Sequence, residues 1–273
     1  MTVKCVIFVE SNRNQHMKQV KDFTIIETLR YNDMYSRLRL RPSDSSELPD
    51  NILPGQFVQV EVGTPGVFLR RPISVNDVDY EANTLDLLVR KAGKGTEALI
   101  AMKEGERVNV LLPLGNGFTT AGVAPGQRLL LIGGGVGVAP LLYLGKVLKS
   151  AGHKPEFLLG ARSAGDLLQV AEFGKVGKVH LSTEDGSAGE KGFVTVNSAL
   201  SGPVDMIYCC GPSPMMKAVA AIAREKGVRC EVSLENMMAC GLGACLCCVE
   251  NTVKGNVCVC TEGPVFNIEM LNW

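Results

Sequence analysis

Closely spaced cysteines near the C-terminus are the part of the sequence best suited to chemistry. Cys240, Cys245 and Cys248 follow the spacing C-x4-C-x2-C, and Cys258 and Cys260 lie a short distance downstream. Thiolates with this spacing hold a [2Fe–2S] cluster, which takes its fourth ligand from a cysteine further along the chain. Small residues between the first two cysteines let the backbone fold closely around an inorganic core. The sequence therefore predicts a cluster whose fourth ligand is Cys258 or Cys260.

The same cysteines have three alternative uses. A structural zinc site usually has two short C-x2-C pairs, and only one clean pair is present here. Plain buried cysteines are a second alternative. Disulfides are not expected, because nothing marks the chain as secreted. Cys247 lies between two expected ligands and cannot easily reach the same cluster, so we interpret it as a spare thiol.

The composition indicates a compact globular protein. The 273 residues carry a formal net charge of +0, which offers no argument for binding nucleic acid or a membrane surface. No apolar run reaches about 18 residues, so we expect no membrane-spanning helix. Residues 1–10 contain a short apolar run without a cleavage site and are interpreted as a strand or an extension, not a signal peptide. Abundant free cysteine then favours a reducing, cytoplasmic setting.

Two segments with different patterns precede the cysteine region. Residues 18–123 contain short strand-like segments, at 23–29, 35–40, 56–62 and 84–90, and a short helix is expected at 94–102. This spacing suggests an antiparallel β-barrel domain.

After Pro125-Gly126, residues 124–228 alternate between strand and helix patterns, which predicts a doubly wound parallel sheet. The expected helices include 141–149, 166–173 and 214–226. Residues 229–273 are expected to form a small third domain.

A glycine-rich loop opens the α/β segment and has the residue types that bind a pyrophosphate. It reads Gly133-Gly134-Gly135-Val-Gly137-Val-Ala-Pro140 and directly follows a strand. Glycines let the backbone approach a phosphate, and the next helix offers N–H groups and the positive end of its dipole. Proline in the first helical turn gives up only a donor that was already free. The third glycine of the dinucleotide fingerprint is missing, so a tight turn without a ligand is the alternative.

Two barrel segments have the residue types for another phosphate-containing ligand. Arg71-Pro-Ile-Ser74 combines a permanently charged guanidinium, a stiff turn and a hydroxyl group, which suit a phosphate and the edge of a flat ring. An Arg-Pro pair at a strand end is otherwise usually structural. Gly93-Lys-Gly95-Thr96 is a glycine turn that enters a helix, again a place for phosphate.

A third motif, Cys210-Gly211-Pro212, ends the last expected parallel strand. Ligands of open α/β sheets lie outside the carboxyl ends of strands, so we expect Cys210 to lie against a nicotinamide ring. Cys209 is explained equally well by packing. Cys230 is interpreted as a free thiol.

Together these motifs resemble the electron-transfer subunits of dihydroorotate dehydrogenase B, a family of the ferredoxin–NADP reductase superfamily. The resemblance covers about residues 20–268, with the motifs in the expected order, and the tail from Cys240 to Phe266 is its most specific part. The sequence departs from the family pattern in a longer polar N-terminus and in the extra cysteines Cys209, Cys247 and Cys258.

The resemblance implies three cofactors and the residues that bind them. FAD would be bound by nine barrel residues: Arg71, Pro72, Ile73, Ser74, Leu88, Val89, Arg90, Gly95 and Thr96. NAD would be bound by the glycine loop and by Gly211 and Pro212, with Cys210 as the catalytic residue. The cluster ligands would be Cys240, Cys245, Cys248 and Cys260, because the family's last ligand precedes a Gly-Pro-Val-Phe stretch.

The resemblance also implies a partner. The family's separate catalytic subunit carries FMN and oxidises dihydroorotate to orotate in pyrimidine synthesis, usually in an assembly with two copies of each subunit. Electrons would pass from this FMN through the cluster and FAD to NAD+. FAD belongs before NAD+ because a flavin exchanges both hydride and single electrons.

Two other functions stay open at the level of sequence. The flavin and iron–sulfur subunit of an NADH-dependent ferredoxin–NADP reductase, or of a sulfhydrogenase, has the same parts and differs in its partner. A non-enzymatic redox sensor is the alternative from another class, and NADH-dependent flavin reduction at catalytic speed would exclude it. Arg162 and Ser163 are placed to meet a 2′-phosphate, whereas the resemblance favours NAD over NADP.

Overall fold

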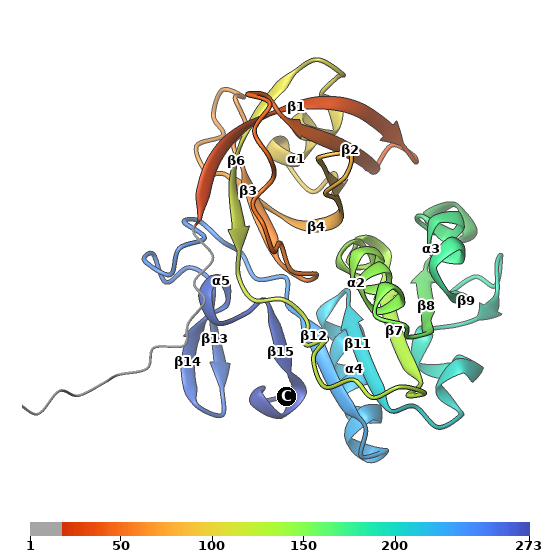
Figure 1. Cartoon of the computed structure of the whole chain (residues 1–273). Helices are drawn as coiled ribbons and strands as arrows, with labels where there is room; N and C mark the ends of the chain where they lie inside the picture. Colours follow the sequence, from red (N-terminus) through yellow and green to blue (C-terminus); the bar gives the residue numbers. More distant parts are fainter. Residues whose placement is uncertain (1–17) are drawn as a thin grey trace, which may run out of the picture.

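A closed antiparallel barrel forms the first part of the computed structural model, which describes residues 18–273 (Figure 1). Its six strands pair in the order β1-β2-β5-β4-β3-β6. The bounds are Gln19–Arg30 (β1), Tyr35–Pro42 (β2), Phe57–Val60 (β3), Arg71–Asp79 (β4), Thr84–Arg90 (β5) and Arg107–Leu114 (β6), with α1 at Lys94–Ala101. The predicted barrel is confirmed. The prediction for residues 1–10 lies outside the described residues.

Side chains of strand β3 pack on both faces of the barrel wall. Val58 and Val60 point into the aliphatic core of the barrel. Side chains alternate along a strand, so Phe57 and Gln59 point outwards. Phe57 belongs to a different hydrophobic cluster, which includes residues of the C-terminal region. The outer face of β3 is therefore covered by another part of the chain.

A seven-stranded sheet forms the second part, in the order β10-β9-β8-β7-β11-β12-β15. The bounds are Leu129–Gly134 (β7), Pro155–Ala161 (β8), Lys178–Thr183 (β9), Glu190–Lys191 (β10), Met206–Cys210 (β11), Arg229–Ser233 (β12) and Val265–Asn267 (β15). All neighbours are parallel except β12 and β15. The main helices are α2 (Ala139–Ser150), α3 (Val170–Val176) and α4 (Ser213–Glu225).

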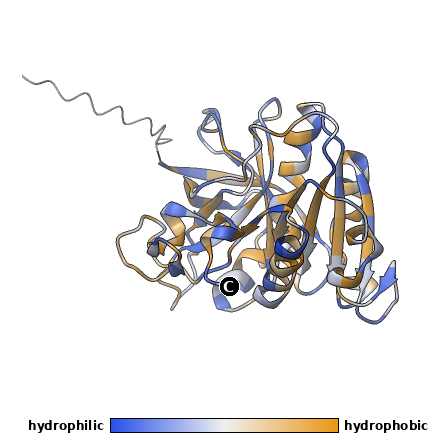
Figure 2. Ribbon diagram, turned by 90° about the horizontal axis from the view of Figure 1, so that it is seen from below, coloured by the Kyte–Doolittle hydropathy of each residue, from blue (hydrophilic) through white to orange (hydrophobic). Residues whose placement is uncertain are grey.

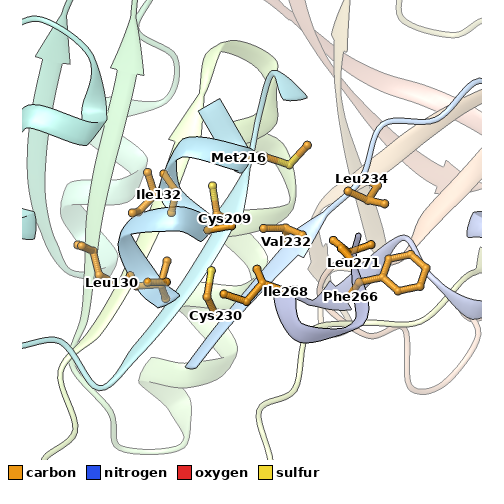
Figure 3. Close-up of a cluster of buried hydrophobic side chains, with 14 of the residues drawn as sticks. Leu130, Ile132, Cys209, Met216, Cys230, Val232, Leu234, Phe266, Ile268 and Leu271 are labelled. Atoms are coloured by element: carbon orange, nitrogen blue, oxygen red, sulfur yellow. The ribbon is translucent and has the colours of Figure 1, made fainter. Parts of the chain in front are cut away.

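Hydrophobic layers cover both faces of this sheet, as a doubly wound arrangement requires. Leu129 and Leu131 of β7 pack with residues of α2 and α3. Leu130 and Ile132, which point to the other face, pack with residues of α4 (Figure 3). The strands of the sheet are accordingly among the most hydrophobic parts of the ribbon (Figure 2). The predicted parallel sheet is confirmed, and its strand order reverses between β7 and β11.

One helix differs from its prediction. Residues 166–173 were expected to be helical, whereas a 3-10 turn covers Ala164–Asp166 and α3 covers Val170–Val176. Gln169, between them, has a φ of 55°, which interrupts a right-handed helix. Its buried side chain instead bonds to Asn76 of the barrel. A contact between distant segments therefore overrides the local helical pattern.

The C-terminal region returns to the parallel sheet. β12 and β15 are its last two strands. The segment between them contains residues 240–248, called the cysteine loop, then the hairpin of β13 (Val249–Thr252) and β14 (Gly255–Cys258), and then α5 (Val259–Glu262). The predicted domain limit at residue 228 falls immediately before β12, and the three predicted domain ranges stay predictions. Among residues 18–273, no helix is long and apolar enough to cross a membrane.

Candidate functional site

A cleft of about 240 Å³ lies where the barrel, the α/β region and the C-terminal region meet. Its barrel side is lined by Phe57, Pro72, Ile73, Ser74, Leu88, Arg90, Ala92 and Thr96. The other sides are lined by Val136, Ala139, Leu234, Glu235, Asn236, Met238 and Pro264. Six of the predicted flavin-binding residues therefore meet in one space, although they come from two strands and the first turn of α1.

Alternation along β5 decides which predicted residues reach the cleft. Leu88 and Arg90 line it. Val89 lies between them, is fully buried and belongs to the barrel core. Its side chain points the opposite way, as expected for successive residues of a strand. The Val89 side chain therefore stabilises the barrel and does not line the cleft.

Arg71, Gly95 and Thr96 form a tight corner at the start of α1. The Arg71 guanidinium lies so close to Gly95 that a Cβ there would be 2.3 Å from Arg71 Nε. Arg71 Nη1 donates to the Leu69 carbonyl at 2.7 Å. The Thr96 hydroxyl accepts from the Ala92 N–H at 2.8 Å. A held guanidinium beside the first turn of a helix offers charge and N–H donors, so the corner suits a diphosphate.

The two loops expected to bind a nucleotide touch where the strand order reverses. β7 leads into the glycine loop, and the neighbouring β11 leads into Cys210-Gly211-Pro212. A Cβ on Gly137 would lie 2.5 Å from both the Cys210 carbonyl oxygen and the Gly211 Cα. Doubly wound sheets bind ligands in the crevice at this point. Gly137 is thus required for the contact between the loops, whether or not a phosphate approaches it.

The remaining loop residues lie at the same edge of the sheet. A Cβ on Gly134 would meet Met215 Sδ at 2.5 Å, and one on Gly133 would meet Val138 Cγ1 at 2.8 Å. Gly135 has a φ of 56°, which favours glycine. Pro140 lies in the first turn of α2, where it was expected. The loop therefore has little room for side chains.

Cys210 lies at the carboxyl end of β11 and is 2% exposed. Burial, with the nearby Glu235 carboxylate, raises the pKa of its thiol well above the ordinary value, although a hydrogen bond with Ser233 opposes the shift. The side chain is therefore a neutral thiol at pH 7.

Glu235 was not found by sequence reasoning. It lines the cleft, and burial raises the pKa of its carboxyl group, while the Arg90 charge opposes the rise. No motif marks this residue. Its signal is its position just after β12, the strand that neighbours β11. Residues after the carboxyl ends of adjacent parallel strands share one edge of a sheet.

Two left-handed glycines shape the cysteine loop. Gly241 has a φ of 69° and Gly243 a φ of 81°. With this backbone, the Leu242 N–H donates to Cys240 Sγ at 3.3 Å, and the Gly243 N–H donates to Cys260 Sγ at 3.1 Å. Burial would raise the pKa of Cys240, but N–H groups of the loop outweigh it and lower this pKa to about 6. At Cys240 the loop therefore stabilises the thiolate, the form that binds metal, whereas burial and the neighbouring Cys248 raise the pKa of Cys260 to about 12.

The four predicted ligands lie as two pairs. Cys245 is within hydrogen-bonding reach of Cys240. The Cys260 N–H donates to Cys248 Sγ at 3.4 Å. Within residues 18–273, no three His, Cys, Asp or Glu side chains are arranged around one metal position. Two pairs of thiols fit the two irons of a [2Fe–2S] cluster better than a single zinc ion.

The three extra cysteines of the sequence and Cys230 have different surroundings. Cys258 is half-buried and lies within hydrogen-bonding reach of Cys248, as Cys260 does, and its Sγ donates to the Gly243 carbonyl at 3.8 Å. Cys247, within the loop between Cys245 and Cys248, is exposed. Cys209 and Cys230 are buried and free in the hydrophobic layer of Figure 3.

Comparisons with family models identify two regions of the chain. Residues 235–272 match the iron–sulfur cluster binding domain of dihydroorotate dehydrogenase B. Residues 131–221 match the oxidoreductase NAD-binding domain. The first range contains the whole cysteine loop and the second contains the glycine loop and Cys210.

Solved structures share the fold. The NADH-dependent reduced ferredoxin-NADP oxidoreductase of a study of flavin-based electron bifurcation has 31% identity and a TM-score of 0.79, with 92% of this chain and 90% of that chain covered. The ferredoxin reductase of carbazole 1,9a-dioxygenase has 23% identity and a TM-score of 0.66, with 77% and 67% covered, and is similar in fold alone. The barrel and parallel sheet are therefore those of ferredoxin reductase-like proteins.

Curated relatives identify the family. The dihydroorotate dehydrogenase B (NAD(+)) electron transfer subunit of Shouchella clausii (strain KSM-K16) is 43% identical over 221 residues, covering 79% of this chain and 85% of the relative. The protein of that name from Caldanaerobacter subterraneus subsp. tengcongensis is 44% identical over 218 residues, covering 78% and 84%. With its cleft, crevice and cysteine loop in one molecule, the chain belongs to the family of dihydroorotate dehydrogenase B electron transfer subunits.

Proposed function

We propose that the cleft, the crevice between the two loops and the cysteine loop are the FAD, NAD and cluster sites of this electron transfer subunit. The observation that carries the proposal is their continuity. Met238 lines the cleft and lies two residues before Cys240. Val136 of the glycine loop lines the same cleft. One space therefore connects the flavin residues to both neighbouring sites.

Different barrel residues are proposed to bind the diphosphate and the ring of FAD. The corner formed by Arg71, Gly95 and Thr96 is assigned to the diphosphate, because it combines a guanidinium with the start of a helix. Ser74 and Arg90 offer polar groups to the ring inside a cleft that is otherwise largely apolar. When bound, FAD supplies the change between two-electron and one-electron transfer. The chain itself contributes binding, orientation and exclusion of water.

Cys210 is proposed as the catalytic residue that contacts the nicotinamide. Its buried neutral thiol lies at the end of β11, between the glycine loop and Glu235. A small neutral thiol leaves a flat ring free to lie against it, and the nicotinamide ring is cationic in NAD+ and neutral in NADH. Glu235 is proposed as a second contact, because it is the carboxyl group that faces the cleft.

Cys240, Cys245, Cys248 and Cys260 are proposed as the cluster ligands. The choice of Cys260 over Cys258 is supported by the direction of their hydrogen bonds. Cys260 Sγ accepts an N–H from Gly243, as a ligand thiolate does, whereas Cys258 Sγ donates to the carbonyl of Gly243.

The partner is proposed to be an FMN-containing dihydroorotate dehydrogenase catalytic subunit, in a cytoplasmic assembly with two copies of each chain. The cysteine loop is the proposed docking region, because it carries exposed apolar side chains. Leu242 is 48% exposed and Leu246 is 64% exposed. An apolar surface beside a cluster favours burial against another protein.

Reconstitution with its partner tests the proposed function. The purified chain, loaded with FAD and cluster, is expected to reduce NAD+ from dihydroorotate only when the FMN subunit is present. Alone, it is expected to show flavin bleaching by NADH but no reaction with dihydroorotate. Absence of coupled NAD+ reduction with a partner that is itself active on dihydroorotate would contradict the assignment.

A second candidate is favoured by the solved structure of the NADH-dependent reduced ferredoxin-NADP oxidoreductase, which covers 92% of this chain. In that case the chain would serve a large partner with several clusters. Pull-down with tagged chain distinguishes the two, because the FMN subunit and the multi-cluster subunit differ in size and visible spectrum.

A further inference from the structure

Gln59 has a buried amide without a hydrogen-bond partner. It lies on the outer face of β3 and has 0% exposure. Neither its Nε2 nor its Oε1 has a partner among the described residues. A buried polar group left unpaired costs about 1–3 kcal/mol. Such groups in native proteins usually have a partner, so the amide indicates that something else binds there.

The amide faces the loop between Cys240 and Cys245. A Cβ on Gly241 would lie 3.0 Å from Gln59 Cγ and 3.1 Å from Gln59 Nε2. The next neighbour of that position is the apolar Leu114. The amide is therefore packed directly against the turn that carries the first proposed cluster ligand, in surroundings that include apolar side chains.

We propose that the Gln59 side-chain amide donates a hydrogen bond to a sulfur atom of the [2Fe–2S] cluster and so raises the cluster's reduction potential. The inference rests on the proposed cluster site. Thiolate and sulfide sulfurs are acceptors, and hydrogen bonds to them stabilise the reduced, more negative cluster. The loop's own N–H groups already reach Cys240 and Cys260, and Gln59 adds a donor from another region of the chain.

The position of Gln59 also links the two electron-carrying sites. Phe57, two residues earlier on the same face of β3, lines the flavin cleft. Two residues along a strand span roughly 7 Å. The backbone of Gln59 pairs with Pro72, another residue of the cleft. A donor at this place would raise the reduction potential of the cluster relative to that of the flavin. It would do so without contacting NAD or the catalytic subunit.

The test compares two glutamine variants of the cluster-loaded chain. Gln59→Met keeps the length of the side chain but removes its N–H. Gln56→Met is the matched control, because Gln56 is 3% exposed and its amide is satisfied by Gly115 and Leu53. Redox titration followed by EPR is expected to show a more negative midpoint potential for Gln59→Met. Gln56→Met should lower the thermal midpoint and leave the potential unchanged.

A second measurement needs no variant. With glutamine labelled by 15N at the side-chain amide, pulsed EPR of the reduced wild-type chain is expected to show a coupled nitrogen. If the wild-type chain has a cluster but shows no such coupling, or if Gln59→Met has the wild-type potential, the inference is wrong. If the wild-type chain binds no [2Fe–2S] cluster at all, the result contradicts the proposed cluster site itself, on which the inference about Gln59 rests.

Discussion

Cys258 and Cys260 are two residues apart, yet secondary structure separates them. Cys258 is the last residue of β14, and Cys260 lies in the following helix, α5. The turn into the helix buries Cys260 to 1% exposure and leaves Cys258 accessible at the edge of the loop. For this pair, spacing along the chain does not distinguish the two sulfurs, whereas their positions in the fold and their hydrogen bonds do.

Substitution of each cysteine by serine tests this difference. Cys260→Ser is expected to abolish the visible absorption of the cluster while FAD stays bound, because a hydroxyl group is a poor ligand for iron in such clusters. Cys258→Ser is the control and should retain the cluster. Absorption and EPR spectra of the two purified variants are the measurement, and the opposite pattern would assign the fourth ligand to Cys258.

The residue types in local motifs were predictable, and their neighbours were not. Three cluster cysteines follow a local spacing, so the sequence indicates them directly. Val89 and Glu235 depend on which way a strand faces and on which strands are adjacent. Gln59 could not be found from local sequence, because its proposed role depends on contact with Gly241, 182 residues later in the chain. Such contacts require the tertiary fold.

At the scale of elements, the loop after β7 and the loop after β11 behave as one unit. They touch through Gly137, which leaves no space for a methyl group. A displacement of one loop must therefore move the other. The crevice expected to bind NAD depends on this contact.

Gly137→Ala tests the coupling of the loops. The added Cβ is expected to destabilise the fold by roughly 1–3 kcal/mol, as overpacking does, and to weaken NADH binding. Gly174→Ala is the matched control, because a Cβ at this exposed position in α3 meets nothing within 4 Å. That change should be neutral or stabilise by about 0.5–1 kcal/mol. Urea unfolding and NADH titration provide the two readouts, and equal NADH affinity in both variants would oppose the idea.

Elements with strong patterns were predictable, and those formed by tertiary contacts were not. The strand before the glycine loop and the helix at α4 follow from their apolar patterns. The helix expected at 166–173 fails because Gln169 turns its side chain towards Asn76. β15 has only three residues, so nothing local distinguishes it from a loop. It becomes a strand because the edge of β12 is available.

At the scale of the whole molecule, a buried pair of amides joins the barrel to the α/β region. Asn76 and Gln169 exchange hydrogen bonds at 3.0 and 2.9 Å, and Asn76 Nδ2 also donates to the Ala139 carbonyl at 2.9 Å. The register of β4 shifts at this point, and such a bulge re-aims a side chain out of the regular alternation. The pair fixes the two walls of the flavin cleft relative to each other.

Removal of one amide of this pair should leave the other unsatisfied. Asn76→Leu is expected to lower the free energy of unfolding by about 1–3 kcal/mol and to raise the dissociation constant of FAD. The double variant Asn76→Leu/Gln169→Leu should lose less free energy of unfolding than the sum of the two single variants, because it leaves neither amide without its partner. Calorimetry and flavin fluorescence provide the measurements, and strict additivity would show that the pair is not coupled.

The pairing of β15 with β12 has a consequence for how this protein can be divided. The last segment of the chain forms the final strand of the sheet that begins with the nucleotide-binding region. Truncation before the cysteines would remove β15 from the edge of β12. The unpaired N–H and C=O groups of β12 would then favour self-association. The iron–sulfur segment is thus no detachable appendage. A flavoprotein fragment lacking it would need a new edge strand before it could remain a monomer.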